Sequence, residues 1–291
     1  LVLGQGSNVL ISDDGYNGVV IVNKISGRQY QSLADGSVLA TFGAGENWDE
    51  IVADTVDQGF WGLENLSHIP GTVGATPVQN VGAYGVEVSD RIVSVQASSL
   101  ITGEQKTFSA EACQFGYRDS YFKTDEGRGW FITSVTFALT TDSSAATVSY
   151  ADLRTFTESK SDFTQQELRN EIIRIRSEKF PDWQQVGTAG SFFKNPIISQ
   201  SLLDEILMQY PDMPHYSQPD GNYKVALGWV LDRVCNLRGY CDGNICLSEH
   251  QALVLLNRGD SAADVSAFVL YVQSEVYKKT QISIEPEVRF I

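Results

Sequence analysis

Three stretches of this 291-residue chain place side chains that could move protons or hold charge among apolar or aromatic residues. Arg118 lies in the run Gly-Tyr-Arg-Asp-Ser-Tyr-Phe-Lys, Ser191 precedes two phenylalanines, and the C-terminal run Ile-Glu-Pro-Glu-Val-Arg-Phe-Ile holds Glu285, Glu287 and Arg289. A partly buried arginine needs an anionic partner, and carboxylates on an apolar strand are costly unless they are paired or functional. Each of the three is therefore a candidate for chemistry.

Each candidate also has a purely structural explanation. Arg118 could pair with its neighbour Asp119 at the surface, Ser191 could cap a turn, and the C-terminal carboxylates could lie on a solvated edge strand. The sequence has no G-x-S-x-G nucleophile elbow and places no histidine to activate a Ser-His-acid triad. Ser191 is therefore predicted to donate a proton or a hydrogen bond.

Two glycine-rich segments could bind phosphate. Residues 4–8, Gly-Gln-Gly-Ser-Asn, follow a short apolar strand, and residues 69–85 hold four glycines and two alanines in 17 residues. Glycine lets backbone N–H groups come close to a phosphate. Residues 4–8 lack the third glycine and the following helix of a Rossmann fingerprint. The alternatives are a plain turn and a tight surface loop.

The elements around these segments are predicted from periodicity and capping residues. Helices are expected at 47–58, with Asn47 as N-cap and Glu50 three residues on, and at 164–179, with a Thr164/Glu167 capping box and an end before Pro181. Further helices are expected at 201–210, 226–234 and 261–279, and strands at 1–3, 9–11, 19–22, within 91–139, at 253–256 and at 282–291. The mixture predicts an α+β fold class.

The composition excludes several classes of protein. Lys and Arg number 21 against 36 Asp and Glu, a net charge of −15, so nucleic acid and anionic membrane surfaces are excluded as partners. An anionic small ligand would need a local cluster of cations. No apolar run approaches the roughly 20 residues of a membrane span, so no membrane insertion is expected. No signal peptide is recognised, and the opening on an apolar strand leads us to expect that the natural protein begins upstream.

The cysteines and histidines give no sign of a metal site. Cys235, Cys241 and Cys246 are separated by five and four residues, which is not the C-x-x-C spacing of structural zinc, and Cys113 lies far away. We expect four free thiols in a reducing compartment. With three histidines in the chain, no metal is predicted.

Taken together, in their order and separations, the segments 4–8, 69–85, 117–120, 189–195 and 285–289 resemble the UDP-N-acetylenolpyruvoylglucosamine reductase family, in its longer type with a tyrosine-containing loop, here residues 149–153. The resemblance covers essentially the whole chain, without the family's N-terminal segment. It implies a two-lobed FAD-binding domain of the vanillyl-alcohol-oxidase/MurB type plus a separate α+β substrate-binding domain. The implied boundaries are 1–24 for the remainder of the first FAD-binding lobe, 25–180 for the second lobe, 181–281 for the substrate domain and 282–291 for a C-terminal strand returning to the flavin.

The resemblance also implies FAD and NADPH as cofactors and a ping-pong reduction of UDP-N-acetylglucosamine enolpyruvate to UDP-N-acetylmuramate. Arg118 and Glu287 would stabilise the enol-like intermediate and Ser191 would protonate the carbon. The implied FAD-binding residues are Gly4, Gly6, Ser7, Asn8, Pro70, Gly71, Gly74, Ala75, Gln79, Asn80, Gly82, Ala83, Tyr84, Gly85 and Arg176. The implied substrate-binding residues are Tyr150, Lys179, Asn195, Tyr216, Lys224, Gln251 and Arg289, with the two lysines on the diphosphate.

A bacterial cytoplasmic monomer is expected on the same resemblance. Two other functions are considered: a flavin oxidase or dehydrogenase of the vanillyl-alcohol-oxidase type, and a nucleotide-sugar or flavin-binding module without activity. Neither has any need for Arg118, Ser191 and Glu287 together, and the reductase is therefore favoured.

Overall fold

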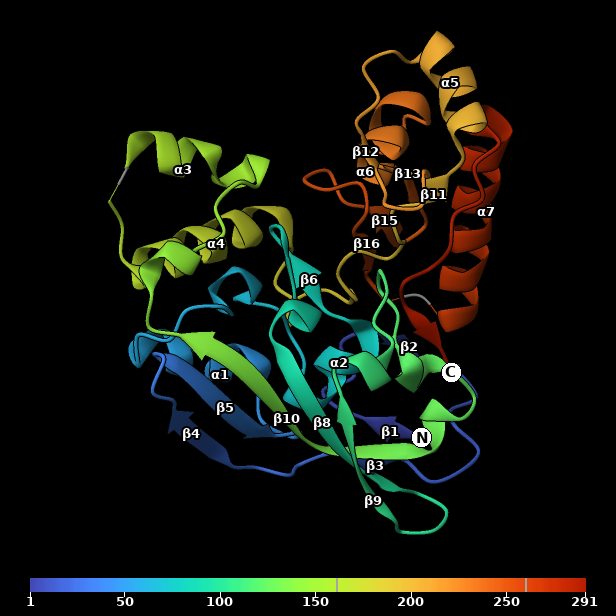
Figure 1. The fold of residues 1–291 in the computed structure, drawn as a ribbon. Coiled ribbons are helices and arrows are strands. Elements are labelled where there is room, and N and C mark those ends of the chain that lie inside the picture. The colour runs from blue at the N-terminus through green and yellow to red at the C-terminus, as the bar shows by residue number, and fades with distance from the viewer. Residues whose placement is uncertain (161, 260) are drawn as a thin grey trace. The chain divides into compact units, whose positions relative to one another are not determined.

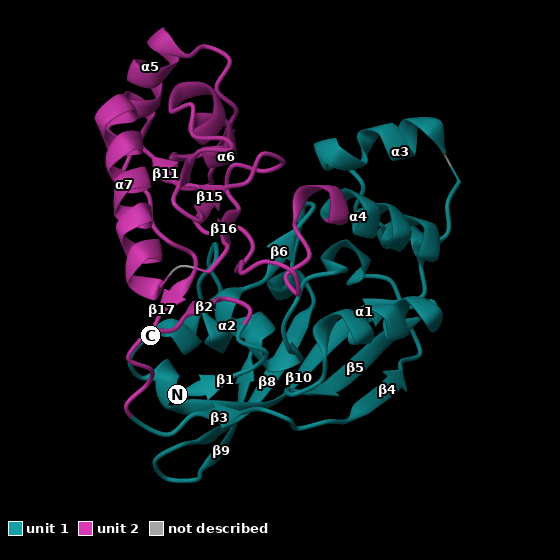
Figure 2. Cartoon of the chain, turned by 180° about the vertical axis from the view of Figure 1, so that it is seen from behind, with its two compact units in different colours: residues 1–6, 18–176 teal, residues 7–17, 177–291 magenta. Residues whose placement is uncertain are grey.

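The computed structural model describes residues 1–160, 162–259 and 261–291, which form two compact units (Figure 2). Unit 1 comprises residues 1–6 and 18–176, and unit 2 comprises residues 7–17 and 177–291. The chain therefore enters unit 2 twice, first for a short segment and then for its last 115 residues. The four-part functional division implied by the family resemblance stays a prediction.

A five-stranded antiparallel sheet forms the centre of unit 1, in the order β4-β5-β10-β8-β9 (Figure 1). Its strands are β4 (Arg28–Ser32), β5 (Ser37–Gly43), β8 (Ile92–Ser99), β9 (Gln105–Ser109) and β10 (Trp130–Thr140). Val38, Ala40 and Phe42 alternate along β5 and are buried, which is the period-two pattern of a strand with one face in a core. That core also contains Trp48, whose ring centroid lies 5.8 Å from that of Phe137 on β10.

The two helices of unit 1 whose caps were predicted form as expected. In α1 (Trp48–Asp57), the Asn47 side chain accepts a hydrogen bond from the Glu50 N–H, and Trp48, Ile51 and Val52 are buried. In α4 (Gln165–Lys179), Thr164 Oγ1 accepts from the Glu167 N–H while the Glu167 carboxylate accepts from the Thr164 N–H, so the capping box is confirmed.

The remaining elements of unit 1 are short. β1 (Val2–Leu3) pairs in parallel with β3 (Ile21–Val22), and β6 (Gly82–Ala83) pairs antiparallel with β7 (Val86–Glu87). Two further α-helices are α2 (Thr76–Gln79) and α3 (Arg154–Ser159). Single 3₁₀ turns lie at Glu64–Leu66, Val73–Ala75, Val88–Asp90, Glu111–Cys113, Tyr121–Lys123, Gly127–Gly129, Ser143–Ala145 and Ala151–Leu153.

Unit 2 is built around a long helix and two small antiparallel sheets. Its helices are α5 (Gln200–Gln209), α6 (Leu227–Trp229), which continues as a π-helical turn at Val230–Val234, and α7 (Ala262–Thr280). One sheet has the order β11-β13-β12 (Ile197–Ile198, Tyr223–Val225, His215–Ser217) and the other β14-β15-β16 (Cys241–Asp242, Ile245–Leu247, Leu255–Asn257). The apolar stripe predicted for α7 is buried, namely Val265, Phe268, Val269, Val272 and Val276.

The C-terminal segment departs from the prediction of one strand over 282–291. Only β17 (Arg289–Phe290) is a strand, and it pairs in parallel with β2 (Val9–Leu10). Just before β17, the chain is hydrogen-bonded to a different segment. Glu287 N–H donates to the Phe192 carbonyl, whereas Arg289 N–H donates to the Asn8 carbonyl. Pro286 has no N–H and cannot continue a regular ladder. The strand predicted at 253–256 is shifted to Leu255–Asn257.

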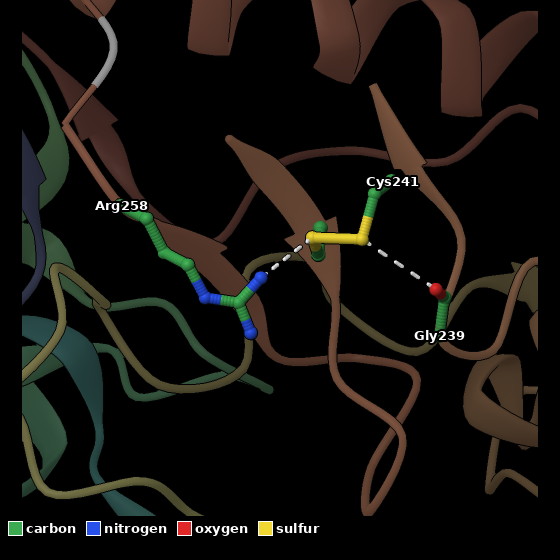
Figure 3. Close-up of a disulfide and its surroundings, with 4 residues drawn as sticks. Gly239, Cys241 and Arg258 are labelled. Carbon is green, nitrogen blue, oxygen red and sulfur yellow. Dashed lines mark hydrogen bonds between the residues drawn. A yellow bond between two sulfur atoms is a disulfide. The ribbon is translucent and has the colours of Figure 1, made fainter. Parts of the chain in front are cut away.

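The prediction of four free thiols is wrong for two of them. Cys241 on β14 and Cys246 on β15 face each other in register, with Cα atoms 4.1 Å apart, and form a disulfide (Figure 3). Their spacing of four intervening residues fits a tight hairpin, which brings the two Cβ atoms close enough for their sulfur atoms to bond. Cys113 and Cys235 are free and buried, as expected.

A buried ion pair joins the two main helices of unit 1 and gives a stability prediction. Arg169 on α4, whose side chain is 9% exposed, binds both oxygens of Asp49 on α1 at 2.7 and 3.0 Å. Replacing Arg169 by Met should lower the free energy of unfolding by about 3 kcal/mol, since it leaves a half-buried carboxylate unpaired. Arg174→Met, at an exposed pair on the same helix, should cost about 0–1 kcal/mol. Equal losses in chemical denaturation of the two variants would contradict this assignment.

The same pair predicts a pH dependence. Burial alone would raise the pKa of Asp49, but the hydrogen bonds from Arg169 and from the His68 N–H together outweigh it and hold that pKa below its ordinary value. A lowered pKa in the folded state stabilises the protein above the ordinary aspartate range, and this stabilisation is lost as pH falls through the lowered value. In Arg169→Met the loss should begin at a higher pH, which thermal unfolding across an acid pH series would measure.

Candidate active site

The two glycine-rich segments predicted to hold a diphosphate lie against each other in unit 1 at residues 4–6 and 71–72. A Cβ added to Gly4 would come within 2.4 Å of the Thr72 hydroxyl oxygen, so only glycine permits this approach without a shift. The Gln5 side-chain oxygen accepts a hydrogen bond from the Gly71 N–H at 3.0 Å. Gly6 has a positive φ of 72° and turns the chain away after this contact.

Several backbone N–H groups of the second segment are already hydrogen-bonded to carbonyl groups of the protein. Val73 donates to the Glu46 carbonyl, Gly74 to the Ala44 carbonyl and Ala75 to the Thr72 carbonyl, at 2.8–3.0 Å. Among the residues that the structure describes, by contrast, the amide N–H of Gly6 donates no hydrogen bond to a protein acceptor. This donor suits a phosphate oxygen, so the turn fits the diphosphate of FAD better than the body of the loop does.

The second half of the loop is braced by Asn80, a predicted FAD contact. Asn80 is 1% exposed and has a φ of 43°. Its side-chain amide donates to the Glu87 carboxylate at 2.8 Å and to the Gly116 carbonyl at 2.9 Å, while its oxygen accepts from the Ser89 N–H. The Asn80 side chain therefore ties the glycine-rich loop to the turn that precedes Arg118.

Arg118 is fixed against this loop. It sits at the corner of a turn in which Gly116 and Asp119 exchange backbone hydrogen bonds, with a φ of 54°. Its Nη2 donates to the Gly82 carbonyl at 2.6 Å, its Nη1 lies 4.0 Å from a Glu87 oxygen, and its side chain is 18% exposed. The structure thus brings Arg118 together with Gly82 of the predicted FAD loop, whose Cβ, if present, would lie 2.8 Å from Nη1.

Two predicted residues of unit 1, Tyr150 and Arg176, lie beside a third, Tyr84. The Tyr84 and Tyr150 rings meet edge to face with centroids 5.5 Å apart. Burial raises the pKa of Tyr84 to about 12, although the nearby Arg176 guanidinium opposes the rise. Arg176 also donates to the His68 carbonyl at 3.1 Å. This group offers an aromatic edge and a cation, which suits a polar part of a cofactor or substrate.

The two other candidate catalytic residues lie on neighbouring segments of unit 2. Ser191 forms a β-bridge with Val254, and the next residue, Phe192, accepts a hydrogen bond from the Glu287 N–H at 2.7 Å. The Glu287 carbonyl in turn accepts from the Asn8 side chain at 3.3 Å. Residues 191 and 287, almost a hundred positions apart in the sequence, therefore lie on neighbouring hydrogen-bonded segments of one unit.

Buried aromatic residues follow Ser191 in the chain. Phe192 and Phe193 are 3% and 1% exposed, with ring centroids 5.4 Å apart, and Phe290 meets Phe192 edge to face. Such surroundings strengthen electrostatic interactions with any charge placed there.

The predicted substrate residues of unit 2 are described in three pairs. Tyr216 and Lys224 face each other in register on β12 and β13, so their side chains lie on the same face of that sheet. Asn195 and Gln251 instead have structural partners, since the Asn195 oxygen accepts from the Leu227 N–H and the Gln251 oxygen from the Leu253 N–H. Lys179 ends α4, and Arg289 is exposed on β17.

Sequence reasoning missed the residues that position others. Gln5 clamps the Gly71 amide, Ser120 donates to the Val78 carbonyl at 2.9 Å, and Lys123 Nζ donates to the Arg118 carbonyl at 2.6 Å. All three lie inside motifs that were recognised, but spacing does not show which backbone group each side chain binds, 66 positions away for Gln5, 42 for Ser120 and 5 for Lys123. No helix among residues 1–160, 162–259 and 261–291 is long and apolar enough to cross a membrane.

Comparisons with known proteins agree with this arrangement. Residues 1–109 match a family model described as an FAD binding domain, and residues 182–291 match the UDP-N-acetylenolpyruvoylglucosamine reductase C-terminal domain. Relatives called UDP-N-acetylenolpyruvoylglucosamine reductase include those of Pasteurella multocida (42% identical, covering 100% of this chain and 84% of that protein) and Haemophilus ducreyi (43%, covering 100% and 83%).

A solved structure has the same fold. The UDP-N-acetylenolpyruvylglucosamine reductase (MurB) of Thermus caldophilus matches with a TM-score of 0.65 at 22% identity, covering 100% of this chain and 84% of that one. The predicted α+β fold class, an FAD-binding domain followed by a separate substrate domain, is confirmed. Because relatives more than 40% identical match along the whole of it, this chain belongs to the UDP-N-acetylenolpyruvoylglucosamine reductase family.

Proposed function

We propose that this flavoprotein oxidoreductase reduces UDP-N-acetylglucosamine enolpyruvate to UDP-N-acetylmuramate with NADPH, a step of peptidoglycan precursor synthesis. The hydrogen bond from Glu287 N–H to the Phe192 carbonyl supports this most, because it holds Glu287 and Ser191 on adjacent segments next to the buried Phe192 and Phe193. FAD, when bound, supplies the hydride chemistry between NADPH and the vinyl carbon of the substrate.

Arg118 is proposed to neutralise negative charge that develops on the substrate carboxylate. A guanidinium carries five N–H donors in a rigid plane, and the hydrogen bond to the Gly82 carbonyl fixes that plane before substrate arrives. Preorganised charge of this kind stabilises a transition state because no reorganisation is needed during the reaction.

Ser191 is proposed to protonate the substrate carbon after hydride transfer. A hydroxyl is a very weak acid, but a carbanion is a stronger base, and the apolar side chains of Phe192 and Phe193 exclude water that would compete. Glu287 is proposed to act in its protonated form as a hydrogen-bond donor to the enol-like intermediate.

The diphosphate of the substrate needs cations within an acidic protein. Lys224 and Lys179 are proposed to meet it, with Tyr216 beside Lys224 on the same sheet face. Tyr150, Asn195, Gln251 and Arg289 complete the proposed substrate contacts. Since the chain carries a net charge of −15, these cations would form a small positively charged region in an otherwise acidic protein.

The glutamate pair of the C-terminal segment offers a matched test. Glu287→Gln should lower kcat by about 10²-fold, because an amide N–H is a much weaker hydrogen-bond donor to the developing negative charge than a protonated carboxyl group. Glu285→Gln, two residues away with a side chain 78% exposed, should leave kcat within about twofold of the parent. Consumption of NADPH with saturating substrate measures both, and equal activity of the two variants would refute the role of Glu287.

A visible spectrum and a turnover assay test the function as a whole. A flavin spectrum with NADPH consumption that depends on UDP-N-acetylglucosamine enolpyruvate would establish the reductase. Consumption that depends on oxygen instead would indicate the flavin oxidase, and bound flavin without turnover would indicate a binding module.

A further inference from the structure

The disulfide of unit 2 joins two sulfur atoms in very different surroundings. Cys241 is exposed on β14, whereas Cys246 on β15 is 2% exposed. The guanidinium of Arg258 reaches toward the buried sulfur, with Nη1 3.1 Å from Cys246 Sγ (Figure 3). On the other side, the carbonyl oxygen of Gly239 lies 3.6 Å from Cys241 Sγ.

These contacts give the two sulfurs opposite preferences in thiol–disulfide exchange. The sulfur that is attacked must be accessible, and the sulfur that leaves must bear a negative charge. Arg258 stabilises a thiolate on Cys246, while the Gly239 carbonyl dipole disfavours one on Cys241. Access and charge therefore both favour attack at Cys241 and departure of Cys246.

We infer that the β14–β15 hairpin is a thiol–disulfide exchange site at which an external dithiol attacks Cys241 and Cys246 leaves as the thiolate. The new S–S bond joins the reductant to Cys241 Sγ as the Cys241–Cys246 bond breaks. The second thiol of the reductant then attacks the reductant's sulfur atom in this mixed disulfide, and Cys241 is released. The reductant loses two electrons and two protons, and the protein gains two thiols. This inference is independent of the proposed reductase activity.

The charges near the disulfide are of both signs. Glu249 packs against Gly239 on the Cys241 side, where a Cβ added to Gly239 would lie 3.0 Å from the Glu249 Cγ. Arg258 lies on the Cys246 side. These two charges act in opposite directions on an approaching thiolate. The structure therefore predicts the order of attack rather than the charge of the reductant.

Mass spectrometry of the folded protein tests the order of attack. The protein is exposed briefly to cysteamine, quenched with acid, alkylated and digested. The expected product carries cysteamine on Cys241 and the alkyl group on Cys246, in about tenfold excess over the reverse. The buried Cys113 and Cys235 report any unfolded fraction, because they react only where the structure opens. An equal split, the reverse order, or free Cys241 and Cys246 thiols after mild oxidation would overturn the inference.

Arg258 variants test the leaving-group argument separately. Arg258→Gln should slow reduction by dithiothreitol about tenfold, and Arg258→Lys should restore most of the rate because it keeps the charge. Arg233→Gln removes an exposed cation of the same unit that pairs with Asp232, and it should leave the rate unchanged. If Arg258→Gln and Arg233→Gln both react like the parent, the guanidinium plays no part and the proposed order loses its basis.

Discussion

Replacing Ser191 by alanine should lower kcat for the complete reaction by about 10²- to 10⁴-fold, the range typical for loss of a positioned proton donor. The effect should be confined to one half-reaction. Bleaching of the flavin absorbance by NADPH should keep its parent rate, whereas its return on addition of the enolpyruvyl substrate should be slow. Stopped-flow absorbance measures the two halves separately.

Two further variants make the Ser191 test specific. Ser191→Cys keeps an acidic proton at the same atom position and should regain part of the rate. Ser201→Ala removes an exposed serine of α5 in the same unit and should have no effect on either half-reaction. A Ser191→Ala protein that binds FAD and turns over at the parent rate would show that the proton comes from elsewhere.

Replacing Arg118 by methionine should lower kcat/KM for the enolpyruvyl substrate by about 10²- to 10³-fold. The loss combines two effects, because the side chain both carries the charge and braces the loop through the Gly82 carbonyl. Arg118→Lys should recover only part of the activity, since a lysine cannot reproduce the planar arrangement of donors. Steady-state kinetics with varied substrate measure the change.

The FAD content separates the two effects of Arg118. If the loop is disturbed, Arg118→Met should lose flavin during purification, and if only charge is lost the flavin should stay. Arg128→Met, an exposed arginine of the same unit that pairs with Asp125, is the matched control. Parent kinetics in an Arg118→Met protein with full flavin would contradict the proposed role.

Local structure could be predicted wherever the determining contacts are local. The Asn47 cap and the Thr164/Glu167 box depend on residues three positions apart, and the buried stripe of α7 follows from a 3.6-residue period. Arg118, Ser191 and the C-terminal carboxylates stood out because polar and charged residues are unusual in apolar stretches, but the choice of Glu287 over Glu285 rested on the family resemblance.

Contacts between distant segments could not be predicted in this way. The partner change after Glu287 depends on which segment lies beside it. The same holds for Gln5 and Asn195, whose side chains satisfy single backbone N–H groups 66 and 32 positions away. Spacing along one sequence carries no information about such partners. The Cys241–Cys246 disulfide is local, but it was missed because the hairpin that pairs the two cysteines was not predicted.

The early entry of the chain into unit 2 has a consequence for synthesis on the ribosome. β2 pairs with β17 at the other end of the chain, and Asp13 binds the first N–H groups of α7, at Ala262 and Ala263, at 2.9 and 3.1 Å. A nascent chain must therefore hold residues 7–17 without their partners while about 250 further residues are added. Unit 1 can begin to form during translation, but unit 2 is completed only after residues 262–290 have been added.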